Sequence, residues 1–187
     1  MKAVLEHVNK SYNGVPVLQD LSMTLEGINV LMAPSGQGKT TLARLLLELE
    51  KPDSGRIKVD GKIAAQFQED RLCPQLTAIQ NILLVCSKSD DGRVRTALKT
   101  LGFLPEDMEK PAAQLSGGQA RRVSLVRALL ASADGVILDE PFKGLDESTR
   151  CKAMEWTRAV LAGRWLLLIT HDDREAKTFG GSTLTWQ

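Results

Sequence analysis

The chain has 187 residues, enough for one domain with its own hydrophobic core and a small subdomain. Its net charge of +1, from 24 basic and 23 acidic side chains, gives no electrostatic case for binding nucleic acid or an anionic membrane. No apolar run approaches the length of a membrane span, and the 3 cysteines are scattered, which predicts reduced thiols rather than a zinc site or a disulfide framework.

The N-terminal region predicts β-structure. Residues 2–8 and 21–25 alternate apolar and polar side chains, as half-buried strands do. Between them, residues 11–14 (Ser-Tyr-Asn-Gly) carry a turn signal. From the local sequence, Tyr12 is a loop aromatic packed on the sheet, and His7 is a surface residue of the first strand.

Residues 33–40 (Ala-Pro-Ser-Gly-Gln-Gly-Lys-Thr) match the pattern of a phosphate-binding loop, named the phosphate loop below. The apolar run 28–32 predicts a buried strand before it, and leucines at helical spacing predict a helix after it: Leu42, Leu45, Leu46 and Leu49. Ala33 stands where glycine is commoner, but alanine is small enough for this turn when its φ is negative.

The chemistry of the phosphate loop indicates a bound nucleotide. Gly36 and Gly38 let backbone N–H groups turn toward an anion, and the helix N-terminus adds the positive end of its dipole. We expect Lys39 to reach the β- and γ-phosphates and the Thr40 hydroxyl to bind Mg²⁺.

The middle of the chain changes from strands to helices. Asp60-Gly61 separates two strand-like runs, 56–60 and 62–67, which predicts a β-hairpin. From about residue 72 to residue 115 the pattern is helical. We expect Thr77 to cap a helix with Ile79, Ile82, Leu83 and Cys86 on one face, and Gly102 to close a helix with Val94, Ala97, Leu98 and Leu101 on one face.

Residues 115–119 (Leu-Ser-Gly-Gly-Gln) precede a helix with an apolar face of Val123, Val126 and Leu130. Ser116 is a good N-cap residue, and the two glycines allow another group to approach the backbone closely. Local chemistry leaves two interpretations open: a second anion-binding helix start, or an ordinary capped loop.

Two buried strands in the last third of the chain end in polar residues. The strand 135–140 ends in Asp139 and Glu140, whose side chains we expect to face opposite ways, so that one acid can hold Mg²⁺. After a helix capped by Asp146, the strand 165–169 delivers Thr170-His171-Asp172 at its carboxyl end. Open parallel sheets bind ligands at this edge.

The order of these motifs resembles the nucleotide-binding subunit of ABC transporters over essentially all 187 residues. Residues 33–40 look like Walker A, residues 115–119 are the unbroken LSGGQ signature, and residues 136–140 look like Walker B with its adjacent glutamate. Other matches are Phe67-Gln68 to the Q-loop, 144–146 to the D-loop, 170–172 to the switch histidine, and Tyr12 to the aromatic that stacks on adenine.

The resemblance implies an α/β fold of the P-loop NTPase class with a mixed or parallel core sheet. It implies a single ABC ATPase domain over residues 1–187. The RecA-like core and an antiparallel β-subdomain would occupy 1–71 and 116–187, and a small helical subdomain about 72–115.

The resemblance also implies ATP binding and hydrolysis with Mg²⁺ in a head-to-tail dimer, where Walker A of one chain and the signature of the other enclose each ATP. Glu140 would polarise the attacking water, and His171 and Gln68 would assist catalysis. The implied nucleotide contacts are Tyr12, Pro34, Ser35, Gly36, Gln37, Gly38, Lys39, Thr40, Thr41, Ser116, Gly117, Gly118 and Gln119. The implied metal ligands are Thr40, Gln68 and, through water, Asp139.

A transporter function implies partners. These are transmembrane permease subunits, with the chain on the cytoplasmic face of the membrane, and a second copy or a second ABC subunit in the ATP-bound dimer. The segment 67–72, followed by Pro74 and Thr77, is similar to bacterial importers of small polar solutes such as sulfonates. We therefore also expect a solute-binding protein, and we expect no nucleic acid.

Other functions compete with this interpretation. The main alternative is a non-transport ABC ATPase that acts as an ATP-driven dimerisation switch. Such proteins commonly carry two cassettes or long coiled coils, and neither is found here. A P-loop kinase or nucleotide switch would share the phosphate loop but has no use for the signature or for His171.

Overall fold

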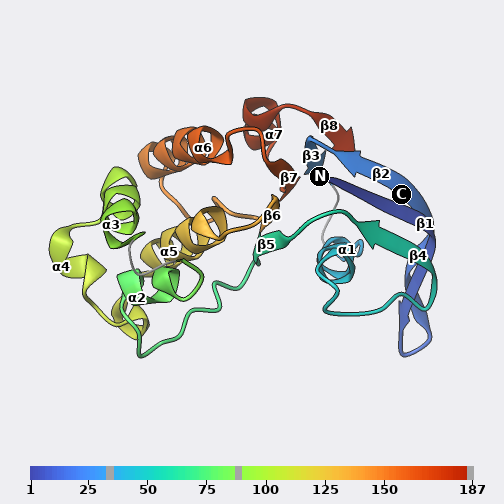
Figure 1. Ribbon diagram of the computed structural model, residues 1–187, viewed down its shortest axis with the longest axis horizontal. Helices are drawn as coiled ribbons and strands as arrows, with labels where there is room; N and C mark the ends of the chain where they lie inside the picture. The colour runs from blue at the N-terminus through green and yellow to red at the C-terminus, as the bar shows by residue number, and fades with distance from the viewer. Residues whose placement is uncertain (33–35, 87–89, 185–187) are drawn as a thin grey trace. The chain divides into compact units, whose positions relative to one another are not determined.

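The computed structural model of the chain describes residues 1–32, 36–86 and 90–184 (Figure 1). The chain forms two compact units. The first consists of Met1–Ile63, Ala133–Asp139 and Gly163–Gln187, and the second of Ala64–Ser132 and Glu140–Ala162. The boundaries expected from the sequence, with a helical subdomain at about 72–115, stay a prediction.

An antiparallel sheet forms the N-terminal part of the first unit. It contains β1 (Lys2–Tyr12), β2 (Val15–Glu26) and β4 (Ser54–Val59) in the order β2-β1-β4. The expected turn is confirmed at Asn13-Gly14, where both residues have positive φ (51° and 78°), as a tight hairpin turn requires. Both strands are longer than predicted, and Tyr12 is the last residue of β1 rather than a loop residue.

The β-hairpin expected at Asp60-Gly61 is wrong. The strand before it, β4, belongs to the antiparallel sheet, whereas β5 (Ile63–Gln66) belongs to a different sheet. The Asp60 amide donates to the Lys2 carbonyl (2.9 Å), and the Lys62 carbonyl accepts from the Asp134 amide (2.9 Å). Long-range hydrogen bonds on each side therefore separate two runs that the local sequence places together.

A parallel sheet forms the core of the first unit. Its strands here are β3 (Ile28–Leu31), β6 (Gly135–Asp139), β7 (Trp165–Ile169) and β8 (Ser182–Leu184), in the order β6-β7-β3-β8. Every residue of β6 and β7 is buried, as expected for parallel strands covered on both faces. The expected α/β class, with a parallel core sheet and an antiparallel N-terminal sheet, is confirmed.

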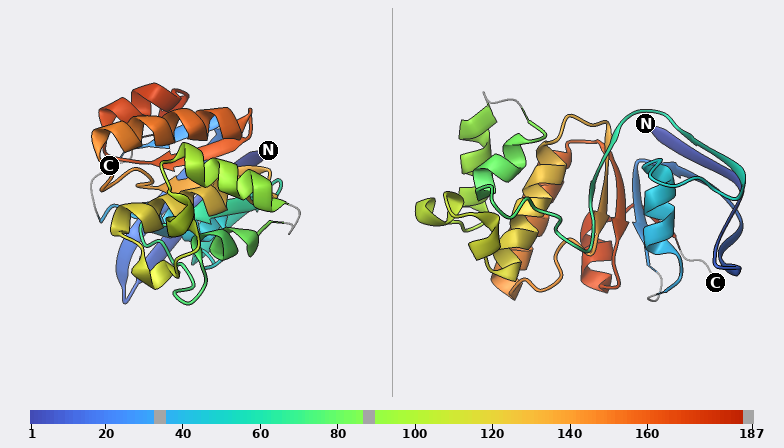
Figure 2. Two further views of the ribbon diagram at one scale, coloured as in Figure 1. Left: turned by 90° about the vertical axis from the view of Figure 1, so that its left-hand side faces the viewer. Right: turned by 90° about the horizontal axis from the view of Figure 1, so that it is seen from below.

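Two helices complete the first unit. In Figure 1 and Figure 2, α1 (Lys39–Leu46) lies between the antiparallel and the parallel sheet. Leu42, Leu45 and Leu46 are buried as predicted, but α1 ends before Leu49, which is 60% exposed. The sequence did not predict α7 (Asp173–Phe179) or β8.

The second unit is helical. It contains α2 (Ala78–Leu83), α3 (Asp91–Thr100), α4 (Pro105–Met108), a 3-10 turn at Ala112–Gln114, α5 (Gly117–Leu130) and α6 (Glu147–Leu161). The central helix is α5, which contacts α2, α3 and α6 and is buried in its second half, from Val123 to Leu130 except at Arg127. The expected N-caps of α2, α5 and α6 are confirmed at Thr77, Ser116 and Asp146.

Over the described residues, no helix has both the length and the apolar character needed to cross a bilayer. Cys73, Cys86 and Cys151 are free thiols.

Candidate functional site

The register of the parallel sheet gathers the predicted motifs of the first unit at one edge. Leu31 pairs with Ile169, and Ile169 pairs with Asp139, so β3, β7 and β6 end side by side. The phosphate loop follows β3, and Thr170-His171 follows β7. Residues far apart in the sequence therefore meet at the carboxyl edge of the sheet, where such sheets bind ligands.

The phosphate loop is described from Gly36 onward, and Ala33, Pro34 and Ser35 lie outside the described residues. Gly38 is the N-cap of α1 and has a φ of +74°. A glycine N-cap offers no side-chain acceptor to the N–H groups of the first helical turn. These groups and the helix dipole are the features that bind an anion.

Thr40 and Asp139 are brought together although they are 99 residues apart in the sequence. The Thr40 hydroxyl donates to Asp139 Oδ2 at 3.4 Å, which is long for a hydrogen bond between oxygens. Asp139 is only 3% exposed, and Thr41, next to Thr40, is also buried. A hydroxyl and a carboxylate are hard oxygen donors of the kind that Mg²⁺ prefers, with Thr40 suited to bind it directly and Asp139 through a water molecule. The chemistry of this pair fits the ion.

Glu140 is not part of the strand, although the sequence predicted it as the last strand residue. The strand ends at Asp139, and Glu140 has a φ of +51° in the left-handed region. The rule that consecutive strand residues face opposite sides therefore does not apply to this pair. The chain turns out of the sheet here, and the Lys143 amide closes the turn by donating to the Glu140 carbonyl (3.3 Å).

His171 is exposed, and its neighbours are held by hydrogen bonds. The Thr170 hydroxyl donates to the buried Glu175 (2.6 Å) and accepts from the Asp172 amide (3.1 Å). Asp172 caps α7 by accepting from the amides of Arg174 (2.8 Å) and Glu175 (3.3 Å). Sequence reasoning missed Glu175, although an acid three residues after Asp172 is a common pattern at a helix start.

Tyr12 is 38% exposed, and a network at the end of the antiparallel sheet holds its ring. Its hydroxyl donates to Glu50, which also accepts from Arg44 of α1 (3.2 Å). Lys10 Nζ lies 5.5 Å from the ring centroid, and its hydrogen bond to Asp53 raises the pKa of Lys10. The ring is therefore held in one orientation while part of its surface stays open.

In the second unit, Ser116 and Gln119 form a capping box at the start of α5. The Gln119 amide donates to Ser116 Oγ (3.2 Å), and the Ser116 amide donates to Gln119 Oε1 (2.9 Å). Gln119 Nε2 also donates to Asp107 of α4 (2.9 Å). Gln119 therefore fixes the loop, while no group of the described residues accepts the proton of the Ser116 hydroxyl.

Neither the backbone conformation nor the packing of this chain requires glycine at positions 117 and 118. Neither has a positive φ. A Cβ at Gly117 would meet no described atom within 4 Å, and one at Gly118 would make only ordinary contacts, such as 3.5 Å to Leu145. The missing side chains leave the backbone open to an approaching group.

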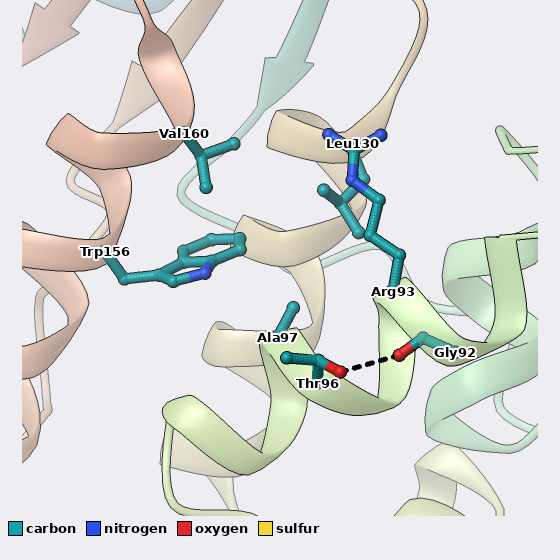
Figure 3. Close-up of a pocket in the computed structure, with 7 residues that line it drawn as sticks. All are labelled: Gly92, Arg93, Thr96, Ala97, Leu130, Trp156 and Val160. Carbon is teal, nitrogen blue, oxygen red and sulfur yellow. Dashed lines mark hydrogen bonds between the residues drawn. The ribbon is translucent and has the colours of Figure 1, made fainter.

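The second unit also contains the exposed Gln68, whose carbonyl accepts from Arg121 (2.7 Å). A separate pocket of about 300 Å³ lies among α3, α5 and α6 (Figure 3). Its lining residues are Gly92, Arg93, Thr96, Ala97, Leu130, Trp156 and Val160, none of which is a predicted site residue. The indole of Trp156 faces this pocket.

Comparisons with known proteins agree with these motifs. The chain matches a family model described as ABC transporter over residues 18–143. It is 36% identical to the aliphatic sulfonates import ATP-binding protein SsuB 2 of Agrobacterium fabrum, over 95% of this chain and 73% of that protein. It is 38% identical to the taurine import ATP-binding protein TauB of Pseudomonas aeruginosa, over 86% of this chain and 67% of that protein.

Solved structures agree with the same assignment. The chain is similar to the ATP-binding cassette MJ0796 in a dimeric post-hydrolysis state bound to ADP and Pi, with a TM-score of 0.88. The two are 26% identical, and the match covers 98% of this chain and 93% of that one. The sequence motifs, the fold and these comparisons together show that the chain belongs to the ABC transporter family, as one of its ATP-binding and ATP-hydrolysing domains.

Proposed function

We propose that the chain is the ATPase subunit of a bacterial importer and acts through separate transmembrane permease subunits. The observation that carries the ATPase part is the approach of Thr40 to Asp139 beside the phosphate loop, at the shared edge of the parallel sheet. The importer part is supported by the names of the relatives, which are import ATP-binding proteins.

The cargo that we propose is a small polar solute. The two relatives named above import aliphatic sulfonates and taurine, so a small sulfonate is the first compound to test. With permease subunits as partners, the chain would lie on the cytoplasmic face of the membrane, and a solute-binding protein would deliver the cargo from the other side.

Within the first unit, each residue has a proposed role. Lys39 and the amides of the phosphate loop would bind the β- and γ-phosphates of ATP, and Tyr12 would stack on adenine. Thr40 and, through water, Asp139 would hold Mg²⁺, and the family resemblance implies Gln68 as a further ligand. The ion would neutralise the phosphate charge that develops during transfer.

Glu140 would accept a hydrogen bond from the attacking water and act as the general base that takes a proton from this water. His171 would contact the γ-phosphate. The hydroxyl of Ser116 and the amide of Gly118 would meet the γ-phosphate of ATP bound to a partner subunit. Gln119 would act by holding this loop, because its side chain is already engaged with Ser116 and Asp107.

We test this proposal with Glu140→Gln and Lys39→Ala, measuring ATP binding and phosphate release by the purified chain. Glu140→Gln should bind ATP and hydrolyse it about 100-fold more slowly, because an amide cannot accept a proton. Lys39→Ala should lose most of its ATP affinity. Wild-type turnover by Glu140→Gln would refute its assignment as the water-activating residue.

The importer part needs a separate measurement. Membrane vesicles that contain the permease and this chain should accumulate a small sulfonate when ATP is supplied on the side of the chain. An ATPase that dimerises with ATP but binds no permease would instead favour the non-transport switch.

A further inference from the structure

The helix that begins at the signature also holds a distant loop. Residues 67–71, named the Q-loop segment here, belong to no helix or strand. Arg121 of α5 donates to the carbonyl oxygens of Gln68 (2.7 Å) and Phe67 (3.4 Å). Arg127, further along α5, donates to the carbonyl oxygens of Asp70 and Arg71, both at 2.9 Å. One helix thus binds the backbone on both sides of Glu69.

A partly buried ion pair adds to this attachment. Arg121 Nε lies 3.2 Å from Asp70 Oδ1, and these side chains are 13% and 21% exposed. The contact is an ion pair without hydrogen-bond geometry, and Oδ1 has no hydrogen-bond partner among the described residues. Burial raises the pKa of Asp70, and the attraction of Arg121 and Arg127 opposes this rise. Removing one partner of such a pair leaves a charge that is partly desolvated and unpaired.

One further contact joins the residue before the segment to α5, and another lies within the segment. Gln66 Nε2 donates to the Arg121 carbonyl (3.4 Å), and the Arg71 guanidinium lies 4.4 Å from the centroid of the Phe67 ring. Because the segment has no strand or helix ladder of its own, these side-chain contacts decide how firmly it is held.

We infer that Arg121 and Arg127 are positioning residues that fasten the Q-loop segment to α5, so that Gln68 and the signature move as one piece of the second unit. The consequence for hydrolysis rests on the proposed function, in which Gln68 binds Mg²⁺ and Ser116 reaches a phosphate. The guanidinium group suits this role because its donors lie in one fixed plane on three nitrogen atoms and can bind two carbonyl groups and a carboxylate at separate positions, whereas the donors of an ammonium group all belong to one nitrogen.

The first test measures the attachment itself by hydrogen exchange of the nucleotide-free full-length chain. The matched control is Arg95→Gln. Arg95 also lies in the second unit and does not touch the Q-loop segment. Its substitution removes two contacts of 2.8 Å, to Asp91 and to Glu109. We expect amide exchange over residues 66–72 to be about tenfold faster in Arg121→Gln than in Arg95→Gln, with other peptides unchanged. Equal exchange in the two variants would overturn the inference.

The second test measures turnover. Arg121→Gln should lower kcat for ATP about tenfold relative to Arg95→Gln, with unchanged stoichiometry of ATP binding, because a small displacement of a reacting group is costly. Arg121→Lys retains the charge beside Asp70 but not the planar guanidinium, so its kcat should fall between those of Arg121→Gln and Arg95→Gln. The same variant replaces Arg121→Gln in this test if Arg121→Gln does not fold. A kcat within twofold of the control would overturn the link to hydrolysis.

Failure of the proposed function is distinguishable from failure of this inference. Lys39→Ala is measured in parallel, and ATP hydrolysis by this variant at the wild-type rate would show that the proposed function is wrong. The exchange experiment decides the attachment of the Q-loop segment independently of any ATPase activity.

Discussion

At the residue scale, Gly38 is more constrained than the other described glycine of the phosphate loop. Both Gly36 and Gly38 have positive φ, at +85° and +74°. A Cβ on Gly38 would lie 2.8 Å from Leu18 Cδ2 and 3.1 Å from the Val17 carbonyl, whereas a Cβ on Gly36 would meet no described atom within 4 Å. Both positions therefore need the conformational freedom of glycine, but only Gly38 also needs the space.

We predict that Gly38→Ala lowers the free energy of unfolding by about 1–3 kcal/mol, because strain and a backbone contact act together. Gly36→Ala is the matched control and should lower it by less, since it shares the strain without the contact. Urea unfolding of both variants measures the difference. Equal losses would show that Leu18 and Val17 move aside without cost.

At the scale of elements, α2 and α5 begin with the same device. In α2, the Gln80 amide donates to Thr77 Oγ1 (3.1 Å) and the Thr77 amide to Gln80 Oε1 (3.0 Å). Ser116 and Gln119 repeat this pattern in α5. The two boxes should contribute similarly to stability, but we propose a phosphate contact only for Ser116.

Thr77→Ala and Ser116→Ala should each lower the free energy of unfolding by about 1 kcal/mol, because each removes one N-cap hydrogen bond. Only Ser116→Ala should also lower kcat for ATP hydrolysis. Urea unfolding and phosphate release, measured on both variants, separate the two roles. If their kcat values were equal, Ser116 would be a helix cap and nothing more.

At the scale of the whole molecule, the two helix starts that we propose to bind phosphate belong to different units. Lys39 opens α1 in the first unit, and Ser116 caps α5 in the second. In the proposed head-to-tail dimer, Lys39 of each chain faces Ser116 of the partner chain. Each ATP would then lie between two chains.

This arrangement predicts that two inactive variants restore activity when mixed. Lys39→Ala retains its signature, and Ser116→Arg, which places a bulky side chain against the phosphate, retains its phosphate loop. Random pairing makes about half of the dimers mixed, each with one intact site, so ATPase activity should reach roughly a quarter of the wild-type value if the sites act independently. Wild-type activity of Ser116→Arg alone would refute a site shared between chains.

The sequence alone determined the features that depend on neighbouring residues. The phosphate loop, the buried strands 135–140 and 165–169 and the caps Thr77, Ser116 and Asp146 were predicted, the first of these strands one residue longer than β6 is. Each depends on local backbone chemistry or on a short apolar run. The order of the motifs also indicated the family, because this order is specific to it.

Only the tertiary structure decided which distant groups meet. It pairs β4 with β1 instead of β5, and it ends β6 before Glu140. It brings Thr40 to Asp139 and fastens the carbonyl of Gln68 to Arg121. These contacts join residues tens of positions apart, and no local pattern specifies them, because they form only when packing of the whole chain compensates the entropy of closing long loops.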